Sequence, residues 1–233
     1  MNRIIRDKNI EKLHKKALAI FSRITTRILE CQEYLVLGIC GGRSIAAIFS
    51  HFPKTNDILW KRIHIFMVDE RLVSIDHPDS NFNNARKIFI ESLTHSKVLP
   101  AENIHPLIID ESREDFGVKK YQEKLNSVGG KFDVVILGIG EDGHIAGLFP
   151  RHHSMENDEE SFITFDDSPK APDNRMSASR KLILKSQAAL AFFVGKSKQN
   201  ALDIFRDNGT EAKRCPAKIL KQLPEAFIFT DLK

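Results

Sequence analysis

The sequence predicts an α/β protein, a three-layer α/β/α domain built on a mostly parallel sheet. Short apolar runs typical of buried strands alternate with longer segments whose apolar residues recur at helical spacing. Such alternation favours parallel strands with helices on both faces of the sheet. No change of composition marks a linker and the sequence has no internal repeat, so residues 1–233 are expected to form one domain.

The expected elements follow one another along the whole chain. Residues 10–29 repeat apolar side chains at helical intervals, from Ile10 and Leu13 to Ile28, and predict a long amphipathic helix. Further helices are expected at 45–52, 81–93, 111–128, 181–187, 197–205 and 216–223. Strands are expected at 34–39, 63–68, 104–109, 133–136, 161–165, 189–194 and 226–230, with a short extended run after Arg175.

Charge and cysteine content limit the function classes. The chain has 35 basic and 31 acidic residues, a net charge of +4 that is spread along the sequence, so nucleic-acid binding is not predicted. Cys31, Cys40 and Cys215 are too few and too far apart for a disulfide framework, which favours a reducing cytoplasm. The first residues lack the apolar run of a signal peptide, and no segment has the length of a membrane span.

Two predicted strands end in groups that suit an anionic ligand. The first strand is followed by Gly41 and Gly42 and then by Arg43 and Ser44 at the start of a helix. Backbone N–H groups there could bind an anion. A plain turn with Ser44 as a helix cap explains the same residues, and the G-K-[ST] ending of a Walker loop is missing. The second strand ends in the acids and base of residues 69–71, at the edge of the sheet where α/β proteins bind ligands.

The most informative stretch is FDVVILGIGEDGHIAGLFP at 132–150, a strand that opens through three glycines towards a short helix. It satisfies G-x-G-x-x-G, but Pro150 leaves room for only about two helical turns, so dinucleotide binding is rejected. No H-E-x-x-H pair and no G-x-S-x-G elbow occur, and Cys40 reads as a small buried residue under a turn. What remains is His144, two residues after Asp142, in a loop suited to acid–base chemistry on a small anion.

Six stretches in order resemble the 6-phosphogluconolactonase family. They are GGRS (41–44), VDERLVSIDHPDSNFNNAR (68–86), LGIGEDGHIAGLFP (137–150), SPKAPDNRMS (168–177), GKSK (195–198) and the pair Pro216 and Ala217. The resemblance implies a Rossmann-like domain that hydrolyses 6-phospho-D-glucono-1,5-lactone to 6-phosphogluconate in the oxidative pentose phosphate pathway. It implies no organic cofactor, no catalytic metal, and a monomer or weak homo-oligomer.

The resemblance also implies roles for particular residues. His144 would activate water, Asp142 would orient the loop or the imidazole, and Arg71 or backbone N–H groups would stabilise the oxyanion. The substrate, including its phosphate, is expected among Gly41, Gly42, Arg43, Ser44, Asp69, Arg175 and Lys198. The sequence departs from the family pattern at GGRS, where Gly-Gly-Ser-Thr is commoner, and at Ile145 and Gly147, where Thr and Ser are usual.

Two alternatives share these features. Glucosamine-6-phosphate deaminase has the same fold and a similar loop, but that loop continues into a Phe-Asn-Glu-Pro-like sequence whose Glu supports ring-opening chemistry. Here residues 146–150 read AGLFP and contain no acid, which favours the lactonase. A non-catalytic sugar-phosphate binding module would keep the phosphate site without needing His144 and Asp142.

Overall fold

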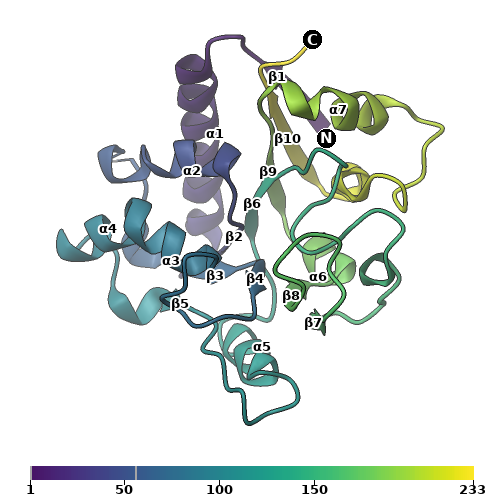
Figure 1. The fold of residues 1–233 in the computed structure, drawn as a ribbon. Helices are drawn as coiled ribbons and strands as arrows, with labels where there is room; N and C mark the ends of the chain where they lie inside the picture. Colours follow the sequence, from purple (N-terminus) through teal and green to yellow (C-terminus); the bar gives the residue numbers. More distant parts are fainter. Residues whose placement is uncertain (1, 56) are drawn as a thin grey trace.

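The computed structural model describes residues 2–55 and 57–233, without the side chains of residues 2 and 43. A parallel seven-stranded sheet runs through the centre of the molecule (Figure 1). In spatial order its strands are β1 (Asn2–Arg6), β10 (Glu225–Thr230), β9 (Ala188–Phe193), β6 (Val134–Gly138), β2 (Leu35–Ile39), β3 (Ile63–Met67) and β5 (Ile104–His105). Every pairing in this sheet is parallel, which confirms the predicted α/β class.

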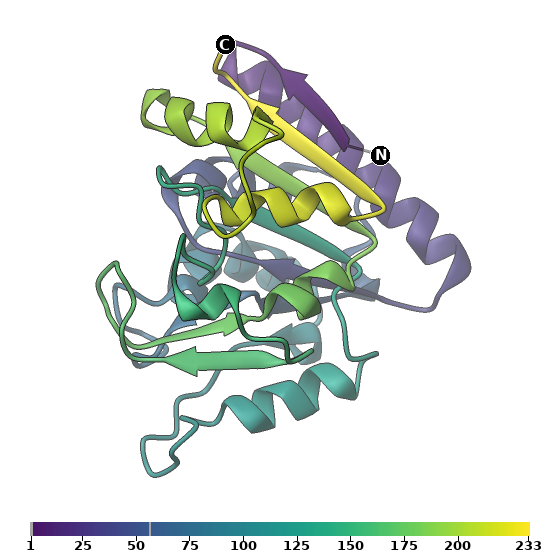
Figure 2. The same ribbon diagram turned by 90° about the vertical axis from the view of Figure 1, so that its right-hand side faces the viewer.

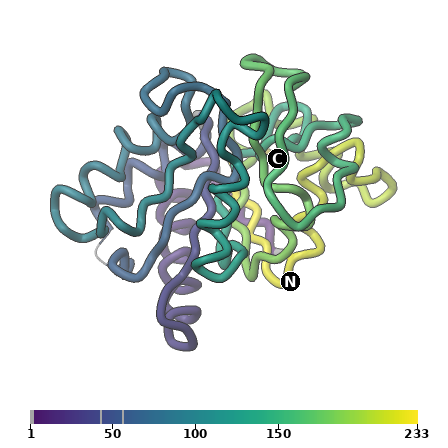
Figure 3. The backbone as a smooth tube through the Cα atoms, turned by 90° about the horizontal axis from the view of Figure 1, so that it is seen from below, coloured from purple at the N-terminus to yellow at the C-terminus, as the bar shows by residue number. Residues whose placement is uncertain are grey.

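Helices cover both faces of the sheet, so the three predicted layers are present. In Figure 1, α1 (Ile10–Cys31) and α2 (Arg43–Phe49) lie on one side, and α6 (Arg180–Leu184) and α7 (Gln199–Arg206) lie on the other. Seen along the perpendicular direction in Figure 3, the N-terminal and C-terminal parts of the chain form largely separate sides. The described core is one cluster of buried apolar residues that extends from Leu13 to Leu232.

The long first helix forms as its sequence pattern predicts. Asn9 caps it by accepting a hydrogen bond from the Lys12 N–H at 3.0 Å. Its stripe of Leu13, Ala17 and Phe21 is fully buried against the sheet. None of the helices in the described part of the chain is long and apolar enough to cross a membrane.

The helical region predicted at 81–93 is a composite. Residues 81–95 form α3 (Asn81–Ala85), a π-helical turn (Arg86–Ile90) and α4 (Glu91–His95) without a break. The region 196–206 likewise begins as a 3₁₀ turn (Lys196–Lys198) before α7, and Pro216–Gln222 is a 3₁₀ helix. These helices stand where the sequence predicts them.

Two sequence-based expectations are wrong in extent. The helix expected at 111–128 is only α5 (Val118–Asn126), because residues 110–116 form turns and Gly117 has a left-handed φ of 86°. The strand expected at 104–109 ends at His105, because Pro106 has no N–H to donate.

The short helix expected after Gly143 is replaced by a turn. Ala146 has a φ of 49°, and the Leu148 N–H donates to the Ile145 carbonyl at 2.8 Å.

A second, antiparallel sheet stands beside the first. It has the order β4 (Asp69–Arg71), β8 (Arg175–Ala178) and β7 (Phe162–Phe165), and its two longer strands run side by side in Figure 2. Arg71 pairs with Arg175 across it. The acidic strand end expected at 69–71 is therefore itself a short strand.

Candidate active site

The carboxyl ends of three adjacent strands, β2, β6 and β9, border one cleft of about 490 Å³. The segment after β2 contributes Gly41, Gly42 and Ser44, and the segment after β9 contributes Ser197 and Lys198. Between them, the segment after β6 contributes residues 138–141 and His144. This edge is where open parallel sheets bind their ligands. Several predicted site residues from distant parts of the chain therefore meet here.

The glycine loop after β6 closes tightly upon itself. The Gly140 N–H donates to the His144 carbonyl at 2.9 Å, and the Gly143 N–H donates to the Gly140 carbonyl at 3.1 Å. Gly143 has a φ of 86°, which favours glycine. A Cβ on Gly140 would lie 2.0 Å from Nδ1 of His144, so only a glycine leaves room for the imidazole.

His144 and Asp142 form a hydrogen-bonded pair inside this loop. Nδ1 of His144 lies 2.6 Å from Oδ1 of Asp142, and the His144 N–H donates to the same oxygen at 3.1 Å. Partial burial raises the pKa of Asp142, but hydrogen bonds and charge from His144 outweigh it and hold that pKa below its ordinary value. The ionised carboxylate accepts the proton of Nδ1, which leaves Nε2 as the basic nitrogen.

Two further side chains support this pair. Nζ of Lys170 lies 3.4 Å from Oδ2 of Asp142 and favours its ionised form. The His144 ring packs on Phe149 with a centroid distance of 4.9 Å, and its side chain keeps 20% of its surface exposed. The imidazole is thus oriented, supported and still accessible from the cleft.

The Gly41–Ser44 turn forms the facing wall. Gly42 adopts a φ of 116° and precedes α2. A Cβ on Gly41 would lie 1.8 Å from Oδ1 of Asn81, so the turn packs directly on α3. Ser44 lies next to Gly138, with its Oγ 3.5 Å from the position of a Cβ there. The backbone of Arg43 begins α2, and its side chain falls outside the described part of the structure.

The acids of β4 are buried and do not line the cleft. Asp69 is 6% exposed, and its Oδ2 accepts from Nδ2 of Asn81 at 3.2 Å. Glu70 accepts from the backbone N–H groups of Arg71, Asn81 and Phe82 at 2.7, 2.7 and 2.8 Å and from the Ser80 hydroxyl at 3.2 Å. These contacts attach β4 to the start of α3. The structure therefore does not place Asp69 on the cleft wall, where the sequence reading expected it.

Arg71 borders a neighbouring hollow of about 260 Å³ that shares Gly41 and Gly42 with the cleft. Its Nη1 donates to the carbonyl of Asp79 at 2.6 Å. Arg71 therefore lies beside the Gly41–Gly42 turn, although it does not line the cleft that contains His144.

Arg175 has a different environment from the one expected. It is 4% exposed and donates from Nε to the Pro172 carbonyl at 2.8 Å. Its Nη2 donates to the carbonyls of Lys170 and Ala171 at 2.9 and 3.1 Å. Burial lowers the pKa of Arg175, and the positive charge of Arg71 lowers it further. The structure uses this guanidinium to hold the loop at 168–173 and does not bring it to the cleft wall.

The sequence reading assigned no role to several residues of the site. Lys170 stands in the SPKAPDNRMS stretch that carries the resemblance, where only Arg175 was singled out. Ser177 of the same stretch accepts from the Gly147 N–H at 3.0 Å, and Cys215 packs against Gly143. The stretch itself was the available signal. Of the two lysines after β9, Lys198 lines the cleft, as the resemblance implied.

Comparison with known proteins identifies relatives over nearly the whole chain. Residues 8–228 match the family model described as glucosamine-6-phosphate isomerases/6-phosphogluconolactonase. A 6-phosphogluconolactonase of Borreliella burgdorferi is 35% identical over 201 residues, which cover 86% of this chain and 85% of that protein. A 6-phosphogluconolactonase of Haemophilus influenzae is 31% identical over 190 residues, 79% of each chain.

Solved structures share the fold. A 6-phosphogluconolactonase from Thermotoga maritima superposes with a TM-score of 0.81 at 24% identity, over 100% of this chain and 99% of that chain. A monomeric glucosamine-6-phosphate deaminase superposes with a TM-score of 0.78 at 19% identity, over 98% and 96% of the two chains. The fold is thus common to a lactonase and a deaminase, and the residues of the site must distinguish the two activities.

Proposed function

Because the chain belongs to the glucosamine-6-phosphate isomerase/6-phosphogluconolactonase family, we propose that it hydrolyses 6-phospho-D-glucono-1,5-lactone to 6-phospho-D-gluconate, the lactonase step of the oxidative pentose phosphate pathway. The observation that carries this proposal is the oriented His144–Asp142 pair in a cleft that also holds Ser44 and Lys198. A lactone carbonyl is already electrophilic, so a positioned water and a base near neutral pKa suffice.

His144 acts as the general base in this mechanism. Its Nε2 accepts a proton from water while the water oxygen bonds to the lactone carbonyl carbon. The tetrahedral intermediate then expels the ring oxygen, which receives the proton back from the imidazolium. Asp142 keeps the imidazole in the required tautomer and stabilises its charged form, as a carboxylate does in other histidine-based sites.

Residues on opposite walls of the cleft bind the phosphate of the substrate in this proposal. We assign the phosphate to Ser44 and the Gly41–Gly42 backbone on one side and to Lys198 on the other, because all of them line the same space as His144. Arg71 stands beside the glycine turn and adds positive charge. Arg175 supports the site indirectly, through the loop that carries Lys170.

The loop after His144 favours a lactonase over a deaminase. Residues 146–150 contain no acid, and the Gly147 N–H is held by the Ser177 hydroxyl. The chain therefore lacks, at this position, the carboxylate that ring-opening chemistry would use. Glucosamine 6-phosphate is accordingly the substrate to compare against the lactone.

A coupled assay on freshly made 6-phosphogluconolactone, with the spontaneous rate subtracted, tests the proposal. We expect turnover of the lactone and none of glucosamine 6-phosphate. His144→Ala should abolish catalysis and retain 6-phosphogluconate binding, whereas His153→Ala, at an exposed histidine outside the cleft, should behave as wild type. Undiminished turnover by His144→Ala would refute the base assignment, and turnover of glucosamine 6-phosphate alone would refute the lactonase.

The setting of the reaction is part of the proposal. Cys31 is exposed and unpaired, and Cys40 and Cys215 are free and buried, which fits a reducing compartment such as the cytoplasm. All groups assigned to the reaction come from one chain, so a monomer or weak homo-oligomer would suffice.

A further inference from the structure

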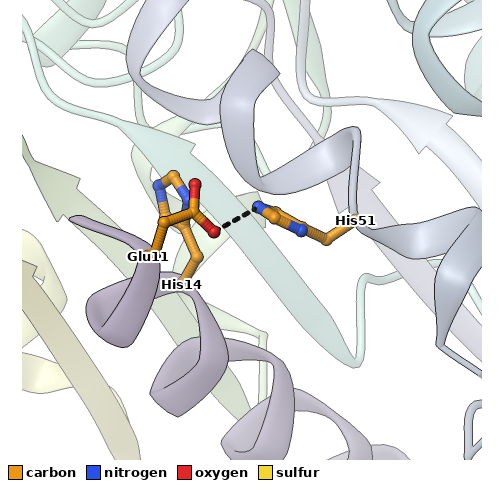
Figure 4. Close-up of side chains that lie close together, drawn as sticks. All are labelled: Glu11, His14 and His51. Carbon is orange, nitrogen blue, oxygen red and sulfur yellow. Dashed lines mark ion pairs between the residues drawn. The ribbon is translucent and has the colours of Figure 1, made fainter.

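Three side chains with metal-binding chemistry meet on the sheet face that α1 and α2 cover. Glu11 and His14 belong to the first turns of α1, and His51 follows the end of α2 (Figure 4). One potential ligand atom from each lies within 4.8 Å of the other two. Oε2 of Glu11 and Nε2 of His51 are 3.8 Å apart, and the His14 and His51 ring centroids are 5.4 Å apart.

In the described part of the chain, the polar atoms of His14 have no hydrogen-bond partner. The residue is 2% exposed, and neither of its ring nitrogens has a hydrogen-bond partner among residues 2–55 and 57–233. A buried polar group left unsatisfied costs about 1–3 kcal/mol, so a native structure that retains one calls for an explanation. A ligand that accepts a nitrogen lone pair would remove this cost.

We propose that Glu11, His14 and His51 bind a divalent transition-metal ion of the Zn²⁺ type. Two imidazoles and one carboxylate are a donor set that such ions prefer, whereas Mg²⁺ and Ca²⁺ prefer oxygen donors throughout. The i, i+3 spacing of Glu11 and His14 places both on one face of α1. Water would complete the coordination shell.

The present spacing needs only a small contraction. Ligand atoms around a tetrahedral Zn²⁺ ion lie about 3.3 Å apart, which follows from bond lengths near 2.0–2.1 Å. The Glu11 side chain is 69% exposed and the His51 side chain is 25% exposed, so both can rotate towards the buried His14. The buried residue would therefore act as the fixed ligand and the two surface residues as the adjustable ones.

A second cluster of potential metal ligands consists of His152, His153 and Asp167, and its side chains are hydrogen-bonded. Both Nε2 atoms contact Oδ1 of Asp167, at 3.1 and 2.9 Å, and Nδ1 of His152 accepts from the Ser154 N–H at 3.2 Å. Hydrogen bonds within the cluster thus explain its geometry. It serves as the matched control for binding to surface histidines.

The proposed ion would act on the fold. None of its three ligands lines the cleft of His144, and the ion would join the start of α1 to the segment after α2. At a hundredfold excess over the dissociation constant, Zn²⁺ should raise Tm by about 5–10 °C. Lactone hydrolysis should be unchanged by chelators at temperatures where the protein stays folded.

The test compares Zn²⁺ binding by calorimetry and Tm in chelator-treated wild type, Glu11→Gln, His14→Leu, His51→Ala and His153→Ala. Wild type and His153→Ala should bind one ion. Glu11→Gln should bind more weakly, and either histidine change should weaken binding at least about 100-fold. His14→Leu removes the unsatisfied nitrogens, so this variant should fold and yet lose its Tm response.

Three outcomes would overturn the proposal. They are a wild type without a Tm shift, an equal shift in wild type and His51→Ala, and binding that His153→Ala abolishes. Co²⁺ supplies an independent readout, because the visible absorption of a low-symmetry Co²⁺ site should appear in wild type and disappear in His51→Ala.

Discussion

Arg175 donates from Nη2 to the carbonyl oxygen of Lys170 at 2.9 Å, and the ammonium group of that lysine lies 3.4 Å from Asp142. A buried guanidinium thus fixes the loop from which Lys170 reaches the carboxylate that orients His144. The connection runs from the small antiparallel sheet to the acid–base pair without any contact between Arg175 and the cleft.

Replacement of Arg175 by Ala should therefore act through the loop. Three carbonyls would lose a charged donor, and we expect the free energy of unfolding in urea to fall by about 3 kcal/mol. We expect the kcat/KM values of phosphorylated and unphosphorylated gluconolactone to fall by the same factor. Lys170→Met, which removes the ammonium and keeps the backbone, is the control and should lose less stability. A defect confined to the phosphorylated lactone would place Arg175 on the phosphate instead.

Gly140→Ala should disable catalysis without unfolding the protein. The new Cβ would occupy space 2.0 Å from Nδ1 of His144 and displace the imidazole from Asp142. A misplacement of about 1 Å can cost about 100-fold in rate, so kcat should fall at least that far. Gly209→Ala, where the nearest atom apart from the two chain neighbours is Oδ1 of Asp207, 3.7 Å from the new Cβ, should leave kcat and Tm unchanged. A Gly140→Ala variant with wild-type kcat would show that the loop can move aside.

The parallel sheet could be predicted because each of its strands has a local sequence pattern. Runs such as Leu35–Ile39 and Val134–Gly138 are short, apolar and followed by glycines, and their alternation with helices fixes the class. The α/β class also explains why Ser44, His144 and Lys198 lie in one cleft, because the carboxyl ends of parallel strands lie at the same edge of the sheet. This part of the site could therefore be predicted from the sequence.

The small sheet and the role of Arg175 could not be predicted in the same way. Arg71 pairs with a residue more than a hundred positions later, and nothing local in either segment specifies the partner. Whether Arg175 is exposed or buried depends on the path of the 168–173 loop, which the sequence does not specify. Without that path, a charged residue in a family motif is naturally interpreted as a ligand for the phosphate. The turn after Gly143 likewise depends on the left-handed conformation of Ala146, a residue that ordinarily favours helix.

Glu70 should make stability depend on pH near neutrality. Burial raises the pKa of Glu70 to about 7 from 4.5, although backbone hydrogen bonds from Phe82, Asn81 and Arg71 oppose the shift. The folded state therefore binds the proton of Glu70 more tightly than the unfolded chain does. The contribution of Glu70 to the free energy of unfolding is fully present below pH 4.5 and is lost as the pH rises to about 7. The whole decline amounts to about 3 kcal/mol.

Glu70→Gln isolates this effect. Both carboxyl oxygens accept from N–H groups, so an amide NH₂ must face at least one donor, and the variant should be less stable than wild type near pH 5. Because glutamine does not titrate, the difference in unfolding free energy should narrow between pH 5 and pH 8. Urea unfolding at several pH values measures it, and a difference that stays constant would show that Glu70 titrates normally.

Lys198→Ala should weaken recognition of the phosphate while the chemical step survives. Lys198 borders the same cleft as Ser44 and His144, and a lysine there can pair with phosphate oxygens. Loss of one charge-assisted hydrogen bond should raise KM for 6-phosphogluconolactone about 10- to 100-fold. The KM of unphosphorylated gluconolactone should not change. Lys196→Ala is the matched control, because Lys196 begins the same 3₁₀ turn and does not line the cleft. If Lys196→Ala raised KM and Lys198→Ala did not, the phosphate would have to be assigned to the other lysine.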